Sequence, residues 1–320
     1  IPDMVQMMKD KGFAYMSEGA LVVDVKEDTD TKEIPPCIIL KSDGASLYST
    51  TDLATLVMRM KENNPDRVIY LADARQSMHF IQVFRCARKT GIVPDTTELV
   101  HIGFGTMNGK DGKPFKTRDG GVMRLEYLLK EIDDEMLNKI KENQKEKENL
   151  NIDEAEAKQT AKTVALAAVK YGDLSNQASK DYIFDIDRFT SFEGNTGPYI
   201  LYTIVRIKSI LSKYEAKGGD ISALKDAIMP AVNAGQKNLM LSLAKFNATI
   251  ESAYEESAPH KICAYIYELA NAFNGFYHDT KILSEENEEL KKSYISLLVL
   301  TKEILEACID MLGFSAPDRM

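Results

Sequence analysis

The sequence has 320 residues, of which 44% are hydrophobic and 28% are charged. These fractions are typical of a soluble globular protein and exclude a collagen-like, a wholly disordered or a disulfide-scaffold chain. At roughly 100–200 residues per domain, the length predicts about two domains. The longest apolar run, residues 294–300, is too short to span a bilayer, so we expect no membrane partner.

The cysteine pattern favours reduced thiols. Cys37, Cys86, Cys263 and Cys308 form no CxxC pair and no Cys/His cluster, which predicts core thiols and no metal site. No basic, apolar and small-residue segment opens the chain, so no secretory signal is visible. Together these features predict a cytoplasmic location. The chain begins at Ile1 rather than Met, so we expect it to be processed or a fragment.

Charge is unevenly distributed along the chain. The net charge is −9, with 12 basic and 9 acidic residues in 36–121 and 14 basic and 20 acidic residues in 181–320. An acidic chain is not a generic nucleic-acid binder, because phosphate affinity rests on clustered Lys and Arg. It still permits a local RNA-binding face that works through shape, stacking and a few Arg contacts.

The first third of the sequence alternates strand-like and helix-like segments. Apolar runs predict strands at 20–25, 37–40, 67–72 and 99–102. Ser49-Thr-Thr-Asp52 resembles a capping box, and apolar spacing predicts helices from there to residue 63 and over 76–90. The last three strands and two helices predict a β/α unit with parallel strands, the run at 67–72 being of the buried kind. Ligands are then expected at the strands' carboxyl ends, at 41–44, 73–76 and 103–105.

The remainder is predicted to be a loop and then helices. Residues 105–121 are rich in glycine and lysine, which indicates a mobile loop, and residues 130–162 form a charge-dense helical stretch with a solvated face. Helices expected near 196–214, 222–233, 236–256, 260–275 and 284–312 read as an all-α bundle.

Several residues admit two interpretations from the pattern alone. The loop lacks both the P-loop and the GxGxxG spacing, so Lys113, Lys116 and Arg118 either clamp a phosphate group or belong to a solvated hairpin. Asp52 is either a helix cap or an anion that faces a cationic ligand. His79 either faces phosphate or has a surface or core role, and His101 is either a core histidine or a ligand.

A set of motifs resembles the arginyl-tRNA synthetases, which are class I aminoacyl-tRNA synthetases. The motifs occur in the family's order and spacing over essentially the whole chain: Asp43-Gly-Ala-Ser-Leu-Tyr-Ser-Thr-Thr-Asp52, Asp73-Ala-Arg-Gln-Ser-Met-His79, His101-Ile-Gly-Phe-Gly105, Gly112-Lys-Pro-Phe-Lys-Thr-Arg-Asp-Gly120, Asp181-Tyr-Ile-Phe-Asp185, Phe192-Glu-Gly-Asn-Thr-Gly-Pro-Tyr199 and Pro317-Asp-Arg-Met320. The resemblance implies α/β plus all-α architecture, in which a partial Rossmann-type catalytic domain precedes a helical-bundle anticodon-binding domain. We expect the boundaries at 1–125, 126–180 and 181–320, with a connecting helical region in the middle.

The resemblance also implies an activity, its substrates and the residues that bind them. The family joins arginine to tRNA(Arg) through arginyl-adenylate, with ATP and Mg. Arginine binding is implied for Tyr48, Asp52 and Gln76, whose oxygens suit a guanidinium with five donors. ATP binding is implied for His79, His101, Gly103, Phe104, Lys113, Phe115, Lys116 and Arg118, and no resident metal is expected. For tRNA, Tyr199 follows a turn, Arg206 lies two helical turns further along the same face, and Met320 ends the chain in the family's pattern. Tyr199 is alternatively a core tyrosine, and Arg206 a surface ion-pair residue.

The sequence departs from the family's two class signatures. Phe115-Lys-Thr-Arg118 is a degenerate form of the KMSKS loop, and the HIGH signature is missing, since His101-Ile-Gly-Phe lies after the arginine-site motif. We therefore expect HIGH and the amino-terminal tRNA-contacting domain upstream of Ile1. The chain is then the carboxyl-terminal part of a synthetase, expected to be monomeric and inactive alone. The alternative is a non-catalytic tRNA- or protein-binding module derived from a synthetase.

Overall fold

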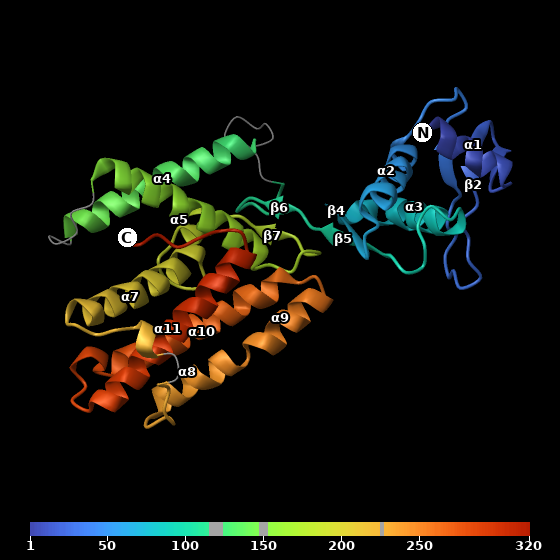
Figure 1. Ribbon diagram of the computed structural model, residues 1–320. Helices are drawn as coiled ribbons and strands as arrows, with labels where there is room; N and C mark the ends of the chain where they lie inside the picture. The colour runs from blue at the N-terminus through green and yellow to red at the C-terminus, as the bar shows by residue number, and fades with distance from the viewer. Residues whose placement is uncertain (115–123, 147–152, 225–226) are drawn as a thin grey trace. The chain divides into compact units, whose positions relative to one another are not determined.

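The structure is a computed structural model that describes residues 1–114, 124–146, 153–224 and 227–320. The chain divides into two compact units, Ile1–Thr106 and Met107–Met320, each of which is described by itself (Figure 1). The predicted boundaries at 125 and 180 stay predictions.

The first unit begins with a helix and a small antiparallel sheet. Its three strands lie in the order β1-β2-β3, with Val23 of β2 opposite Cys37 of β3. The elements are α1 (Pro2–Asp10), β1 (Ala14–Ser17), β2 (Ala20–Val23) and β3 (Cys37–Leu40). The prediction that residues 37–40 join the parallel unit is wrong for the described residues. A run of four apolar residues fits either kind of sheet, and here β3 pairs with β2.

A parallel β–α–β unit follows, as the sequence predicts. Strands β4 and β5 pair in parallel, with Tyr70 opposite His101, and α2 and α3 lie side by side (Figure 1). The elements are α2 (Tyr48–Asn63), β4 (Arg67–Asp73), the 3-10 turn η1 (Ala74–Gln76), α3 (Ser77–Lys89) and β5 (Glu98–Phe104). Val68 belongs to the core that α2 and α3 share, whereas Ile69 and Leu71 on the other face are 47% and 68% exposed. Within the described residues of this unit, the helices α2 and α3 cover one face of β4, so the run at 67–72 is not buried on both faces.

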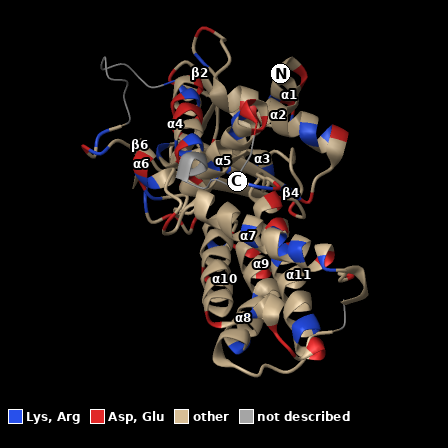
Figure 2. Cartoon of the chain, turned by 90° about the vertical axis from the view of Figure 1, so that its left-hand side faces the viewer, with Lys and Arg blue, Asp and Glu red and all other residues tan. Residues whose placement is uncertain are grey.

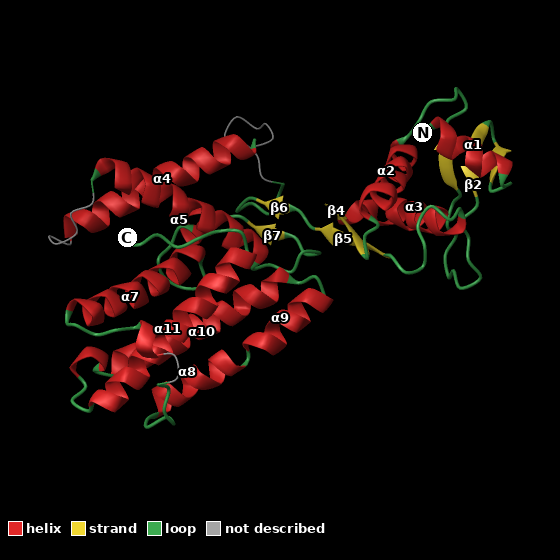
Figure 3. Cartoon of the chain, viewed as in Figure 1, coloured by secondary structure: helices red, strands yellow, loops and turns green. Residues whose placement is uncertain are grey.

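Among its described residues, the second unit is almost entirely helical apart from one short strand pair (Figure 3). Met107 and Asn108 of β6 pair in parallel with Tyr182 and Ile183 of β7. The elements are β6 (Met107–Asn108), α4 (Leu125–Glu146), α5 (Glu154–Leu174), β7 (Tyr182–Ile183), α6 (Ile186–Phe189), α7 (Gly197–Ala216), η2 (Ser222–Leu224), α8 (Ala234–Ala244), α9 (Phe246–Glu255), α10 (Pro259–Asp279), η3 (Ile282–Ser284) and α11 (Glu288–Met311). The predicted loop at 105–121 therefore includes a strand.

Two predicted helices differ in the structure. Over 222–233 only the short turn η2 is helical among the described residues, since Pro230 is incompatible with a helix interior. The predicted helix 236–256 is two helices, α8 and α9, which meet at Lys245. Apolar periodicity continues through both, so the pattern alone did not reveal the break.

The charged helix α4 is amphipathic rather than simply solvated. Acidic and basic residues follow one another closely along it, whereas α10 carries few charges (Figure 2). The inward face of α4 carries Ile132 and Met136, which are completely buried in the same core as residues of α5 and α7. This apolar stripe fixes α4 to the helical core, and charged side chains such as Glu131 and Asp134 lie on its exposed face.

Among the described residues, no helix is both long and apolar enough to cross a membrane.

Candidate functional site

The start of α2 carries two of the predicted arginine-binding residues. Leu47 precedes the first residue of α2, and the Thr50 hydroxyl links it to β3, because it accepts a hydrogen bond from the Leu47 backbone N–H at 2.9 Å and donates one to the carbonyl of Ile39. Asp52 is the fifth residue of the helix, beyond the position of an N-terminal cap. Asp52 is therefore not the helix cap. Tyr48 and Asp52 are four residues apart on one helix face, and the Tyr48 side chain is 86% exposed. This face of α2 is open to a ligand.

Asp52 is instead paired with His79 of α3. The Asp52 carboxylate oxygen Oδ2 lies 2.6 Å from His79 Nε2, and both side chains keep about a quarter of their surface exposed. Gln76, the third predicted arginine residue, is exposed three residues before His79 at the start of α3. The structure thus brings the Asp52 and His79 side chains into contact, one turn from Tyr48 and Gln76 along their respective helices.

Polar groups also gather at the carboxyl ends of β4 and β5. The Asp73 carboxylate accepts hydrogen bonds from the Arg75 side chain and backbone N–H, which lower the pKa of Asp73 to about 2. At Gly103 of β5, a Cβ would come within 2.9 Å of the Ala74 backbone. Gly103 therefore permits β5 to approach the turn η1 closely. The next predicted ATP residue, Phe104, is 42% exposed.

His101 is half-buried in β5. Its ring stacks on Phe80 with a centroid distance of 4.5 Å, and its Nε2 is buried with no hydrogen-bond partner within the described residues. Phe80 contacts the His79 ring on another side, at 5.1 Å. His79 and His101, which are both predicted ATP residues, therefore contact the same buried ring, that of Phe80.

The described base of the glycine- and lysine-rich loop belongs to the second unit. Gly109 N–H donates to the carbonyl of Lys113 at 2.8 Å, which closes a turn, and the Lys113 side chain is exposed. Three predicted ATP residues, Phe115, Lys116 and Arg118, lie outside the described residues. The prediction of a mobile loop at 105–121 also falls in part on residues 115–121, which lie outside the described residues.

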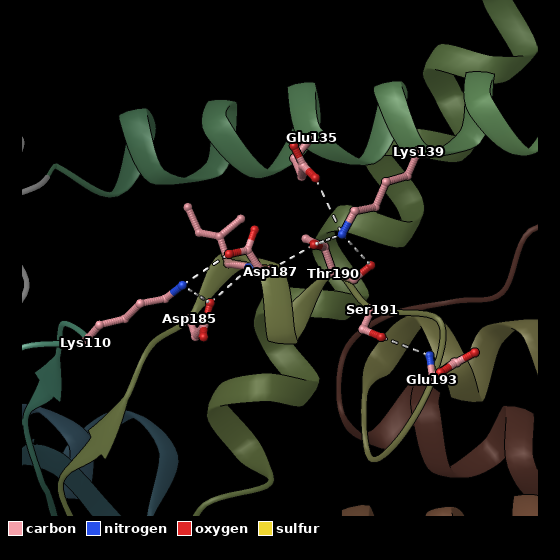
Figure 4. Close-up of polar contacts among 9 residues, drawn as sticks. Lys110, Glu135, Lys139, Asp185, Asp187, Thr190, Ser191 and Glu193 are labelled. Carbon is pink, nitrogen blue, oxygen red and sulfur yellow. Dashed lines mark hydrogen bonds and ion pairs between the residues drawn. The ribbon is translucent and has the colours of Figure 1, made fainter.

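An ion-pair cluster fixes this turn to α6, as Figure 4 shows. Lys110 Nζ lies 3.0 Å from Asp185 Oδ1 and 3.1 Å from Asp187 Oδ2. Burial opposes ionisation of Asp185, but the hydrogen bonds from Lys110 and from the backbone outweigh it and lower the pKa of the carboxyl. On the other side of α6, Lys139 of α4 donates to the Thr190 hydroxyl at 2.7 Å. Lysines from two segments thus hold α6 at both of its ends.

The segment from Ser191 to Tyr199 packs tightly on α5. The Tyr171 hydroxyl donates to the Cys263 carbonyl at 2.8 Å and lies 2.6 Å from the Asn195 side-chain oxygen, and burial raises the pKa of this tyrosine. A Cβ on Gly197 would lie 2.3 Å from the Ala167 carbonyl oxygen. The motif residues Asn195 and Gly197 therefore serve helix packing, and they place Tyr199 at the start of α7.

Tyr199 and Arg206 meet in a polar and aromatic cluster between α7 and α10. The Tyr199 hydroxyl donates to Asn271 at 2.6 Å and accepts from Asn274 at 2.9 Å, while Asn274 accepts a hydrogen bond from Arg206. The Arg206 guanidinium also lies over the rings of Tyr202 and Tyr277, at 4.8 and 5.3 Å from their centroids. We call these residues the α7–α10 cluster: Tyr199, Tyr202, Arg206, Asn271, Asn274 and Tyr277.

Sequence reasoning missed the α10 members of this cluster. Asn271, Asn274 and Tyr277 recur at three-residue spacing in a helix that is otherwise largely apolar. That spacing places polar side chains on one helix face and was the available signal.

The chain end is anchored to the helical unit. Arg319 forms a two-nitrogen ion pair with Glu156 of α5, and Met320 packs against the helical core. Lys208 of α7 contacts Asp318 at 3.4 Å. Met320 therefore has a fixed place among the helices.

No group of three or more His, Cys, Asp or Glu side chains in the described part of the chain could hold a metal ion.

The chain contains a parallel β/α unit that is followed by a helical domain. This is the organisation of a class I aminoacyl-tRNA synthetase, and comparisons with known proteins agree with it. The family model described as "tRNA synthetases class I (R), catalytic domain" matches residues 1–186, and the model described as "DALR anticodon binding domain" matches residues 200–320. The first match covers more than half of the chain. The chain belongs to the arginyl-tRNA synthetase family.

Individual relatives and solved structures support this assignment. The chain is 98% identical to an arginine–tRNA ligase of Agathobacter rectalis over 320 residues, and 54% identical to one of Alkaliphilus oremlandii over 317 residues. It covers 54% and 52% of those proteins, so it spans about half the length of the curated relatives it matches. The arginyl-tRNA synthetase of Plasmodium falciparum superposes with a TM-score of 0.82 at 26% identity, over the whole of this chain and 52% of that one. The Thermus thermophilus enzyme, also at 0.82 but 22% identical, shows the fold alone.

Proposed function

We propose that the protein carrying this chain joins arginine to tRNA(Arg). In the first step an arginine carboxylate oxygen attacks the α-phosphorus of ATP, forms arginyl-adenylate and releases pyrophosphate. In the second step a ribose hydroxyl at the tRNA end attacks the activated carbonyl and releases AMP. Membership of the arginyl-tRNA synthetase family is the observation that carries this proposal.

Arginine recognition is proposed to centre on Asp52. Its carboxylate keeps 28% of its surface exposed, and Tyr48 lies one turn before it on the same helix. A carboxylate pairs with a planar guanidinium through charge-assisted hydrogen bonds, and a phenol and an amide oxygen can accept the remaining donors. Tyr48, Asp52 and Gln76 are therefore the side chains that we assign to arginine.

ATP is proposed to bind near the carboxyl ends of β4 and β5 and through loop cations. Gly103 and Phe104 end β5, and an exposed aromatic ring there can stack on an adenine base. Lys113, Lys116 and Arg118 supply the charges for the phosphates. Mg is proposed to arrive bound to the ATP phosphates as part of the substrate. His101 has one unpartnered buried nitrogen, which suits a hydrogen bond to the nucleotide.

The tRNA anticodon is proposed to bind on the α7–α10 cluster. The unit from 107 to 320 includes the acidic stretch 181–320, so generic phosphate attraction is weak and loop bases are recognised by stacking and edge contacts. Tyr199, Tyr277 and Arg206 provide aromatic and guanidinium surfaces of that kind. Met320 is assigned to the same function through the resemblance of Pro317-Asp-Arg-Met320 to the family's motif.

The decisive experiment compares the isolated 320-residue chain with a full-length synthetase that contains it. The full-length protein should exchange pyrophosphate into ATP when arginine and tRNA(Arg) are supplied, and lysine should not replace arginine. The isolated chain should bind tRNA(Arg) without forming adenylate. If the full-length protein binds tRNA but forms no arginyl-tRNA, the non-catalytic binding module is correct instead. A cytoplasmic location and a monomeric state stay predictions, which cell fractionation and light scattering measure.

A further inference from the structure

The contact between Asp52 and His79 joins two helices at the predicted arginine site. Asp52 is the fifth residue of α2 rather than the residue that precedes it, so its carboxylate has no capping role that would explain its position. Its Oδ2 atom lies 2.6 Å from His79 Nε2, which is the short distance of a charge-assisted hydrogen bond. The pair spans 27 residues of sequence and leaves both side chains partly exposed.

Aromatic packing fixes the direction in which His79 presents its nitrogen. The imidazole meets the ring of Phe80 edge-on, at 5.1 Å and 75°. Phe80 is itself buried and contacts Tyr70 at 5.0 Å and Phe84 at 5.7 Å. Since Phe80 is held on several sides, the imidazole beside it has a defined orientation toward Asp52.

We propose that His79 is a positioning residue for arginine recognition, holding the Asp52 carboxylate in place rather than binding the nucleotide. This inference rests on the proposed function. Imidazole N–H donation to Oδ2 uses one of the acceptor sites of the carboxylate and leaves Oδ1 and the second site of Oδ2 for a guanidinium. A carboxylate fixed in this way loses less rotational freedom when arginine binds, because its orientation is set beforehand.

The two roles of His79 predict different kinetics in a full-length synthetase that contains this segment. His79→Ala should raise the KM for arginine about tenfold, the effect of a lost hydrogen bond to a charged group, and leave the KM for ATP within about twofold. His79→Gln places an amide N–H near the position of Nε2 and should restore most of the arginine affinity. His79→Asn is shorter, does not reach Asp52 and should behave like the alanine variant.

A double-mutant cycle tests whether His79 acts through Asp52. Adding His79→Ala to an Asp52→Asn enzyme should change the arginine KM less than about twofold, because the carboxylate that His79 holds is already lost. Phe84→Leu is the matched packing control. It loosens the packing around Phe80 and keeps the hydrogen bond between His79 and Asp52, so it should lower the melting temperature and raise the arginine KM less than His79→Ala does.

Three results would overturn the inference: an unchanged arginine KM in His79→Ala, an equal rise in the KM for ATP, or a full additive effect on top of Asp52→Asn. If His79→Ala does not fold, the comparison of the glutamine and asparagine variants decides, and equal arginine KM values for those two would reject the inference. A parent enzyme that does not charge tRNA with arginine would instead reject the proposed function.

Discussion

Arg85 of α3 and Asp30 in the loop after β2 form a bidentate ion pair. The two terminal guanidinium nitrogens lie 2.8 and 2.7 Å from the two carboxylate oxygens, and the Asp30 side chain is only 8% exposed. Arg85 also donates to the carbonyl of Val25 at 3.2 Å. A loop with the composition of a solvated turn is thus fastened to a helix 55 residues further along the chain.

The Asp30 contact makes folding stability depend on acid pH in a predictable direction. The hydrogen bonds from Arg85 and from the Glu27 backbone lower the pKa of Asp30 from 3.8 to about 2. A lowered carboxyl pKa stabilises the folded state above the unfolded-state value, and that stabilisation disappears as pH falls through the folded-state value. We therefore expect Asp30→Asn to lower the melting temperature at pH 7, and the difference from the parent to shrink between about pH 4 and 2.

The measurement is thermal unfolding of both proteins across this pH range. Asp28→Asn, an exposed position in the same loop, is the matched control and should leave the melting temperature nearly unchanged at every pH. A difference between parent and Asp30→Asn that stays constant down to pH 2 would contradict the assigned pKa.

Gly197 is predicted to tolerate no side chain. A Cβ there would lie 2.3 Å from the Ala167 carbonyl oxygen and 2.6 Å from its carbon, both backbone atoms of α5. Gly197→Ala should therefore destabilise the protein by about 1–3 kcal/mol, the cost of overpacking. Gly275 in the interior of α10 has nothing within 4 Å of its Cβ position, so Gly275→Ala should stabilise by about 0.5–1 kcal/mol. Urea unfolding measures both, and equal effects would refute the packing argument.

Asp52 should dominate the affinity for arginine. In the full-length synthetase, Asp52→Ala should raise the arginine KM at least about tenfold, since a charge-assisted hydrogen bond is worth about 1.5–3 kcal/mol. The KM for ATP is the internal control and should change little. Steady-state aminoacylation measures both constants. Asp52 does not cap α2. An unchanged arginine KM would therefore mean that Asp52 serves the contact with His79 and does not bind arginine.

The sequence predicts the local elements well and their long-range partners poorly. The helices α2 and α3 follow from apolar periodicity, which reports the burial of one helix face, and the strands β4 and β5 follow from short apolar runs. The partner of Asp52 does not follow, since nothing in the local pattern relates residue 52 to residue 79. The same limit applies to β3, whose four apolar residues do not specify a partner strand. The family resemblance predicts Asp52 and Tyr199 as site residues, whereas the contacts that each of them makes are known only from the structure.

Tyr199 is predicted to contribute an aromatic surface to anticodon binding. Its ring meets the Tyr267 ring edge-on at 5.8 Å, and its hydroxyl is bonded to Asn271 and Asn274, so the ring is held in place before any RNA binds. A base stacked on such a ring is worth about 1–3 kcal/mol. We expect Tyr199→Ala in the 320-residue chain to weaken binding of a tRNA(Arg) anticodon stem-loop by that amount, and Tyr199→Phe, which keeps the ring, to weaken it much less.

Binding is measured by fluorescence anisotropy with a labelled stem-loop, after thermal unfolding has shown that each variant is folded. Tyr254→Ala, at a tyrosine of α9 that is 70% exposed, is the matched control and should bind like the parent. An unrelated stem-loop should bind weakly to all of the proteins and be insensitive to Tyr199, because generic phosphate attraction to this acidic unit is small. If Tyr199→Ala weakens both stem-loops equally, or if Tyr199→Phe loses as much affinity as Tyr199→Ala, the ring does not stack on an anticodon base and the hydroxyl network alone accounts for the residue.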